Sequence, residues 1–256
     1  MADEPRGEKG RLYHVNLRKG DVGRIALLPG DPDRVPHIAK RFRNTKILSN
    51  HREYTAYGGY VGNEYVVAMS TGIGGPAAAI AVEELARLGV KVMIRVGTCG
   101  AISTKAKLGS VLIPDAAVRM EGTSAQYVPA GYPAAATPEV VLALRDAAIA
   151  LEKPFAVGTV ASTDSFYVGQ ARESFGGYFP SEKESLIGDL RNANVLGFEM
   201  ECATIYTLAR VFGLRAGAVL AVVASRASNE FNRGAGVDEA IDVAIEGVRR
   251  INRYAR

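Results

Sequence analysis

The sequence lacks the features that mark several common protein classes. Its 256 residues include only 2 cysteines, Cys99 and Cys202, and neither has a CxxC partner, which argues against a disulfide framework, a metal site and a redox pair. No apolar run approaches about 20 residues without a charge or a glycine, so we expect no membrane span. The first residues are polar and mixed in charge, unlike a signal or transit peptide. We therefore expect a cytoplasmic protein with two buried thiols.

A strong charge imbalance is also absent. Lys+Arg number 31 and Asp+Glu 27, which gives a formal net charge of +4. The arginines are dispersed among acidic residues, with no basic stripe interleaved with aromatics, and this argues against a nucleic-acid-binding protein. With 48% hydrophobic and 23% charged residues, the composition is that of a soluble globular protein and excludes a disordered or collagen-like chain.

Short β-prone segments alternate with helical ones along the chain. The patterns predict strands at 24–28, 65–70, 92–96, 111–114, 155–160 and 216–224, and helices at 76–88, 138–151, 199–211 and 237–250. The last two strands are apolar enough to be buried on both faces. No linker or repeat divides the chain, so we expect one α/β domain over residues 1–256, with helices on both faces of a sheet. In such sheets ligands bind beyond the strand ends.

A glycine-rich segment, Gly72-Ile73-Gly74-Gly75-Pro76-Ala77, matches the dinucleotide-binding pattern G-x-G-x-x-A between a strand and a helix. The next strand, however, ends in Arg95 and glycine, without the acidic residue that would hold a ribose hydroxyl. Pro76 inside the motif is also unusual. The segment is therefore weak support for nicotinamide binding.

Three arginines lie at or near predicted strand ends. Arg34 closes the turn Gly30-Asp31-Pro32-Asp33-Arg34, Arg52 lies in His51-Arg52-Glu53, and Arg95 opens Arg95-Val96-Gly97-Thr98-Cys99-Gly100. A guanidinium in an apolar strand needs an anionic partner and suits phosphate or carboxylate, while a threonine hydroxyl and glycine amides can add hydrogen bonds. By themselves, two of these arginines, Arg34 and Arg52, are more typical of an exposed surface. Arg95 points to an anion site or an ion pair.

Several motifs in register resemble the nucleoside phosphorylase-I family, and within it the uridine phosphorylase branch. They are GDPDR, HREYT, STGIGGPAAAIAVEEL, IRVGTCGAI, STDSFYVGQ and FEMECATIY, and they span nearly the whole chain from His14. The resemblance implies a three-layer α/β/α fold with a central mixed, twisted sheet. It also implies reversible phosphorolysis of a nucleoside, uridine plus phosphate giving uracil plus ribose 1-phosphate.

The resemblance assigns residues to phosphate and to the sugar. It implies a phosphate site formed by Gly30, Arg34, Arg95 and Thr98, with Arg52 supplied by a neighbouring subunit. The ribose would be held by Glu199, Met200 and Glu201, with His14 of a neighbour at the 5′-hydroxyl. A carboxylate such as Glu201 can accept hydrogen bonds from two adjacent hydroxyls, whereas acidic residues at a helix start can also simply favour the helix dipole.

For the base, the resemblance implies that Phe166, Gln170, Arg172 and Arg226 surround uracil, and that Arg95, Glu201 and Arg172 are catalytic. A glutamine amide can donate and accept while arginine only donates, which suits the acceptor–donor–acceptor edge of uracil. Purine-specific relatives have an aspartate that can protonate N7, and the residue here is Arg226, which cannot. Purine nucleoside and methylthioadenosine phosphorylases on the same fold remain the alternative, followed by a nucleosidase and a non-catalytic nucleoside sensor.

The sequence departs from the family at two places. The family's serine that joins a glutamate, here Glu53, in holding a monovalent cation is replaced by Ala77, and residues 175–184 match no family segment closely. We expect no metal and no cofactor, with inorganic phosphate as co-substrate. The resemblance also implies a homo-hexamer built as three dimers with shared sites. From Arg95 we expect that Arg95→Ala removes phosphate-dependent cleavage and leaves the fold intact.

Overall fold

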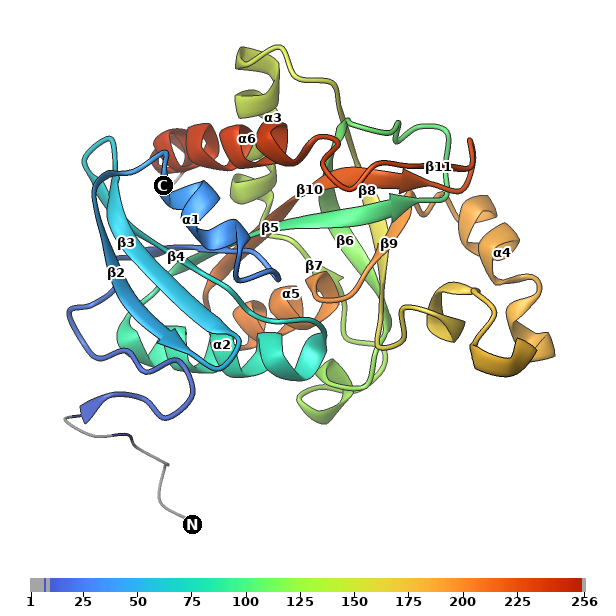
Figure 1. Cartoon of the computed structure of the whole chain (residues 1–256), viewed down its shortest axis with the longest axis horizontal. Coiled ribbons are helices and arrows are strands. Elements are labelled where there is room, and N and C mark those ends of the chain that lie inside the picture. The colour runs from blue at the N-terminus through green and yellow to red at the C-terminus, as the bar shows by residue number, and fades with distance from the viewer. Residues whose placement is uncertain (1–6, 8–9, 255–256) are drawn as a thin grey trace.

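A computed structural model describes residue 7 and residues 10–254 of the chain. In this part, eleven strands form one mixed sheet in the order β11-β10-β6-β8-β9-β5-β1-β4-β3-β2, with β7 paired to β6 (Figure 1). The strands are β1 Ile25–Leu28, β2 Arg43–His51, β3 Tyr54–Val61, β4 Glu64–Met69, β5 Val92–Ala101, β6 Val111–Met120, β7 Ala134–Ala135, β8 Phe155–Thr163, β9 Gly197–Glu199, β10 Arg215–Ser225 and β11 Glu230–Phe231.

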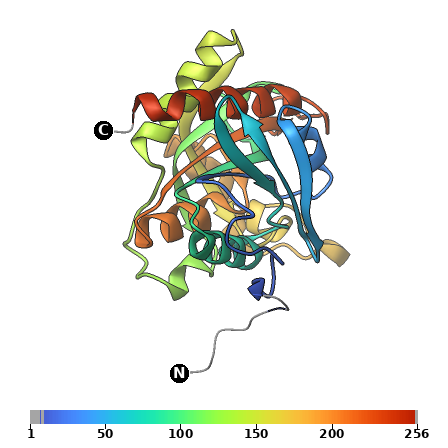
Figure 2. The same ribbon diagram turned by 90° about the vertical axis from the view of Figure 1, so that its left-hand side faces the viewer.

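Helices cover both faces of the sheet, which gives the expected three layers (Figure 1, Figure 2). They are α1 Arg34–Ala39, α2 Gly75–Leu88, α3 Pro138–Ala150, α4 Leu186–Asn192, α5 Cys202–Val211 and α6 Val237–Arg250. Alternate residues of each strand serve opposite faces. Ala26 and Leu28 pack with α2 and α5, whereas Ile25 and Leu27 pack with α1, α3 and α6.

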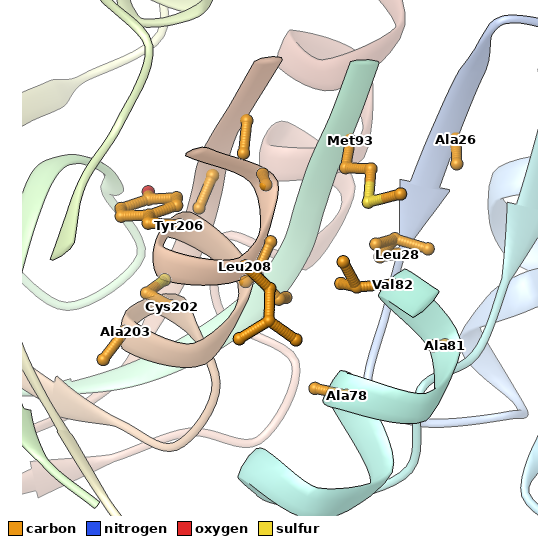
Figure 3. Packing of buried hydrophobic residues seen from close by; sticks show 14 of the residues in the cluster. Ala26, Leu28, Ala78, Ala81, Val82, Met93, Cys202, Ala203, Tyr206 and Leu208 are labelled. Carbon is orange, nitrogen blue, oxygen red and sulfur yellow. The ribbon is translucent and has the colours of Figure 1, made fainter. Parts of the chain in front are cut away.

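The core beneath α2 and α5 is built from small and medium side chains that let the helices approach the sheet. Figure 3 shows Ala78 of α2 facing Leu208 of α5, and Val82 of α2 beneath Met93 of β5 and beside Leu28 of β1. This close packing fixes the amino-terminal ends of α2 and α5. These are the ends that carry the glycine-rich segment and Glu201.

Five strands close into a ring at the centre of the sheet. Strand β10 pairs with β5 in parallel and with β6 antiparallel, β6 and β9 both flank β8, and β9 returns to β5. The sequence did not predict this closure, because β9 has only three residues and no apolar run.

Element boundaries differ from the predicted ones where tertiary contacts decide them. Strand β5 continues through Gly97–Ala101, because β9 and β10 pair with that segment. The predicted helix 199–211 begins only at Cys202, since Glu199 lies in β9. Strand β10 is buried as expected, but the first half of β8 is not, because β9 reaches only Val160–Ser162 and leaves an open edge.

Candidate active site

A cavity of about 1240 Å³ opens at one edge of the sheet. Strands β1, β4, β5 and β10 run parallel, so the segments that follow them meet at this edge. Eleven of the predicted site residues line the cavity: Gly30, Arg34, Arg95, Thr98, Phe166, Gln170, Arg172, Glu199, Met200, Glu201 and Arg226. Two predicted site residues, His14 and Arg52, do not line it.

Arg95 lies at the centre of the cavity wall, between two carboxylates. Its Nε donates to Oε2 of Glu199 at 3.0 Å, and its Nη2 lies 2.5 Å from Oε2 of Glu201. Burial alone would lower the pKa of Arg95, but the fields of Glu201 and Glu199 outweigh it and raise that pKa. The third nitrogen, Nη1, is buried and has no hydrogen-bond partner in the described part of the chain. Nη1 of Arg95, with its two N–H groups, is therefore left to donate to a ligand.

The glycines beside Arg95 make room for its guanidinium. A Cβ at Gly97 would lie 2.8 Å from the guanidinium carbon of Arg95, so a larger residue could not stand there without displacing it. A Cβ at Gly30 would lie 3.9 Å from Nη1. The free donor of Arg95 thus faces the turn after β1, which also carries Arg34.

Arg34 and Thr98 complete a positive end of the cavity. Nη1 of Arg34 donates a long hydrogen bond, 3.4 Å, to the carbonyl of Val96. Burial lowers the pKa of Arg34, and the nearby Arg95 adds to this effect against the opposing fields of Asp31 and Glu201. Because the positive charge of Arg95 lowers the pKa of Arg34, an anion bound beside both guanidinium groups is favoured.

Glu201 connects Arg95 with the glycine-rich segment. Its Oε1 accepts the amide of Gly74 at 2.6 Å, while its Oε2 faces Arg95. The segment holds this carboxylate through a backbone amide, a role that the dinucleotide pattern did not predict. Burial raises the pKa of Glu201, with Arg95 opposing and Glu199 adding to the shift. The backbone of Met200 also hydrogen-bonds this carboxylate, and a carboxylate offers about four acceptor positions, so capacity remains for a sugar hydroxyl.

Glu199 has a different environment from Glu201. Four donors of the protein surround its carboxylate: Arg95, the amides of Glu201 and Cys202, and the hydroxyl of Ser162. Glu199 lines the cavity, but these contacts leave little acceptor capacity for a ribose. Its predicted sugar contact stays a prediction.

The other end of the cavity combines an aromatic ring, an amide and two arginines. The guanidinium carbon of Arg172 lies 4.0 Å from the ring centroid of Phe166, and its Nη1 donates to Oε1 of Gln170 at 2.6 Å. Gln170 in turn donates to Oγ1 of Thr163 at 3.2 Å. This chain of hydrogen bonds orients the amide of Gln170, which is buried at 3% exposure.

Arg172 and Arg226 share this end without a carboxylate to balance them in the described part of the chain. Arg226 donates to the carbonyl of Ala171 at 3.2 Å, and its Nη2 is buried without a partner there. Burial lowers the pKa of both arginines, and the proximity of Arg172 helps to bring that of Arg226 to about 10. Ala171 itself has a left-handed backbone with φ 50°, strain that is typical of functional loops.

His14 and Arg52 are held elsewhere on their own chain. Nδ1 of His14 lies 2.7 Å from Oε1 of the buried Glu84 on α2, and Arg52 contacts the hydroxyl of Tyr13 at 3.3 Å. A reach into a neighbour's site remains a prediction for both residues. It is compatible with their position outside the cavity.

The remaining expectations concern metals, thiols and membranes. Among the described residues, no group of His, Cys, Asp or Glu is arranged to hold a metal ion. Glu53, the glutamate of the family's cation site, lines the cavity, and both Glu53 and Ala77 lie next to Gly72. Both cysteines are buried and free, as predicted, and burial raises the pKa of Cys99 to about 12. Across residues 10–254, no helix combines the length and apolar character that a bilayer span requires.

Some cavity residues were not predicted from the sequence. Ile187 and Arg191 come from α4, and Phe231 comes from β11. The segment before α4 forms two 3₁₀ turns, Phe175–Gly177 and Ser181–Lys183. Neither α4 nor β11 has a strong periodic pattern, so the sequence carried no signal for them.

Comparison with known proteins identifies the family of this chain. The family model described as "Phosphorylase superfamily" matches residues 24–256. The chain belongs to this superfamily. It is 50% identical to a uridine phosphorylase of Thermococcus kodakarensis, over 97% of this chain and 89% of that protein. Identity is 40% to a uridine phosphorylase of Haemophilus influenzae (93% and 95% covered) and 35% to a guanosine phosphorylase of Halorubrum lacusprofundi (94% of each).

Proposed function

We propose that this superfamily member catalyses the reversible phosphorolysis of uridine, giving uracil and ribose 1-phosphate, in the salvage of nucleosides. The observation that carries the proposal is one cavity with an anion-binding end at Arg34 and Arg95, a base-sized end at Gln170 and Arg172, and Glu201 between them. The two uridine phosphorylases that cover nearly the whole chain support the same reaction. The enzyme is then a pentosyltransferase whose acceptor is phosphate.

Phosphate in this proposal binds beside the free Nη1 of Arg95, with Arg34, Thr98 and the backbone at Gly30 as further donors. A dianion there relieves the repulsion between the two arginines. Holding phosphate and nucleoside in one cavity removes much of the entropic cost of bringing them together.

The sugar in this proposal lies over Glu201 and Met200, and the base lies between Phe166 and the pair of Gln170 and Arg172. As the glycosidic bond lengthens, positive charge grows on the sugar and negative charge on the base. Phosphate stabilises the positive charge on the sugar. Arg172, together with Arg226, stabilises the negative charge on the base. Because these interactions strengthen as charge develops, they lower the barrier more than they tighten substrate binding. We propose that neither a prosthetic group nor a metal takes part.

The decisive experiment measures release of uracil from uridine with and without phosphate. We expect turnover that depends on phosphate, together with formation of uridine from uracil and ribose 1-phosphate in reverse. Cleavage at the same rate in phosphate-free buffer would indicate a nucleosidase. Absence of any cleavage would overturn the proposal.

Purine phosphorolysis is the second candidate, because a guanosine phosphorylase is 35% identical over nearly the whole chain. Against it, the residue beside the base is Arg226, which cannot protonate a purine N7. A comparison of uridine, thymidine, inosine, guanosine, adenosine and methylthioadenosine, each with phosphate, separates the two. We expect the highest kcat/KM for uridine.

We also propose a cytoplasmic homo-hexamer, a trimer of dimers, in which His14 and Arg52 complete the site of the adjacent subunit. Their position outside their own chain's cavity supports this arrangement. Size-exclusion chromatography coupled to light scattering tests the mass. An active monomer would contradict the shared site.

A further inference from the structure

The carboxylate of Glu199 is occupied on both oxygens by the protein itself. Oε2 accepts the amides of Glu201 at 2.8 Å and Cys202 at 2.9 Å together with Nε of Arg95, and Oε1 accepts the hydroxyl of Ser162. A carboxylate offers about four acceptor positions. The four donors therefore fix the position and the plane of this group, which has no exposed side-chain surface.

Ser162 lies behind the cavity wall and does not line it. It is fully buried in β8, at the register position opposite Glu199 in β9. Besides donating to Glu199, its hydroxyl accepts the amide of Ala203 in the first turn of α5 at 2.9 Å. One hydroxyl thus connects two strands of the central ring with the start of a helix.

These contacts determine where Arg95 can point. Glu199 holds Nε and Glu201 holds Nη2, so the guanidinium plane is fixed at two of its three nitrogens and Nη1 projects as the free donor. The hold on Nε depends on Glu199 keeping its orientation. That orientation depends in turn on Ser162, since of the four hydrogen bonds named above only the one from Ser162 falls on Oε1.

We propose that Ser162, acting through Glu199, is a positioning residue that aims Nη1 of Arg95 at the phosphate co-substrate. The inference rests on the proposed phosphorolysis. Loss of the Ser162 hydroxyl frees Oε1 and leaves the amide of Ala203 without its acceptor. Glu199 can then rotate, and Arg95 loses the alignment of its free donor while the base end of the cavity is untouched.

The test measures the KM for phosphate and the KM for uridine in Ser162→Ala. We expect the KM for phosphate to rise about tenfold, as for loss of one charge-assisted hydrogen bond, while the KM for uridine changes less than about twofold. Ser162→Cys keeps a weak donor of similar size, so its KM for phosphate should lie between those of the wild type and Ser162→Ala. If the alanine variant does not fold, this cysteine variant carries the test.

Ser124 provides a matched control. It is also fully buried and also donates to a buried glutamate, Glu121, but that glutamate does not touch Arg95. Ser124→Ala should lower the melting temperature without changing the ratio of the two KM values. The same shift of this ratio in both alanine variants, or an unchanged KM for phosphate in Ser162→Ala, would overturn the positioning role.

A readout without turnover separates this inference from the proposed reaction. Inorganic phosphate should raise the melting temperature of the wild type, and Ser162→Ala should need about ten times more phosphate for the same increase. If the wild type fails to cleave uridine but this difference holds, phosphorolysis is wrong and the positioning role stands. If uridine is cleaved and the two phosphate titrations coincide, the positioning role is wrong.

Discussion

Arg95 is held between two buried carboxylates, so its loss acts on the fold as well as on phosphate binding. Removing the guanidinium would leave Glu199 and Glu201 as uncompensated buried charges, a change that typically costs about 3–5 kcal/mol of stability. The sequence led us to expect that Arg95→Ala leaves the fold intact. The two ion pairs change that expectation, and a cleaner test of phosphate binding lies at Arg34.

Arg34→Gln should weaken phosphate binding while leaving the fold stable. The side chain of Arg34 makes one long hydrogen bond to a carbonyl, so little of the fold depends on it. We expect the KM for phosphate to rise by at least about tenfold, since one charge-assisted contact to the dianion is lost. Steady-state kinetics at varied phosphate measure the effect. Arg43→Gln, at an arginine that also donates to a carbonyl but far from the cavity, is the control and should change neither KM.

From the raised pKa of Glu201 we predict that acid lowers activity but increases the contribution of this group to stability. Its pKa is raised above the ordinary 4.5, chiefly by burial. Because the ionised form accepts the sugar hydroxyls, kcat/KM for uridine should fall as the pH drops through this raised pKa, that is, at a pH above 4.5. The folded-state pKa exceeds the unfolded one, so over the same window Glu201 contributes increasing stability as the pH falls.

The comparison variant for this prediction is Glu201→Gln. It should have a much lower kcat/KM and no acidic limb from this group, and its free energy of unfolding should depend less on pH over the same window. An acidic limb that persists unchanged in the glutamine variant would assign the titration to another residue.

At the scale of elements, the glycine-rich segment between β4 and α2 matters for its backbone. Gly74 has φ 91°, a conformation that side chains rarely adopt, and in it the amide points at Glu201. Gly89, at the other end of α2, has φ 106° and closes the helix in open space. Gly89 has ψ 8°, in the left-handed helical region, whereas Gly74 has ψ 165°, in a region essentially restricted to glycine, and of the two only Gly74 contacts the site.

Gly74→Ala should therefore destabilise the protein by about 1–3 kcal/mol, and Gly89→Ala by about 1–2 kcal/mol. Only Gly74→Ala should lower kcat/KM for uridine, because the strained backbone would move the amide that holds Glu201. Chemical denaturation and uridine kinetics on both variants measure the two effects. Equal losses of activity would mean that strain alone, and not the amide, is responsible.

The elements that could be predicted are those with a strong local signal. Helix α6 has the predicted bounds, 237–250. Helix α2 differs from its predicted bounds by only one residue at its start, because a proline marks its beginning and a glycine marks its end. Strand β2 was missed because six of its nine residues are exposed and its sequence shows no regular alternation of apolar and polar residues. The start of α5 was misplaced because the Glu199 carboxylate, and not a local cap, receives the first amides of that turn.

The whole molecule assembles a site from segments far apart in the chain. The sequence motifs predicted which residues would form the site, and eleven of them, the first Gly30 and the last Arg226, line the cavity. They could not predict that Glu199 and Glu201 have different partners, because that difference depends on Ser162 and Gly74 in other elements. The contacts proposed for His14 and Arg52 involve a second subunit, which the sequence of one chain does not describe.

Mixing two inactive variants tests the shared site. Arg52→Ala leaves the cavity complete but removes the side chain offered to a neighbour, and Glu201→Gln does the reverse. In a dimer containing one of each, one of the two sites regains all its parts, so about half of the wild-type activity per mixed dimer should return. Co-expression with two affinity tags isolates the mixed oligomer. No recovery in the mixed species would contradict contribution by a neighbour.

The ring of strands has a consequence for synthesis of the protein. Strand β5, which carries Arg95 and Thr98, completes its pairing only when β10, more than a hundred residues later, lies beside it. The ribosome synthesises the chain from the amino terminus to the carboxyl terminus. The wall of the cavity therefore stays incomplete until β10, shortly before the last helix, has been made. A nascent or prematurely terminated chain that lacks β10 has an incomplete cavity, so we expect phosphate and nucleoside to stabilise mainly molecules in which β10 is in place.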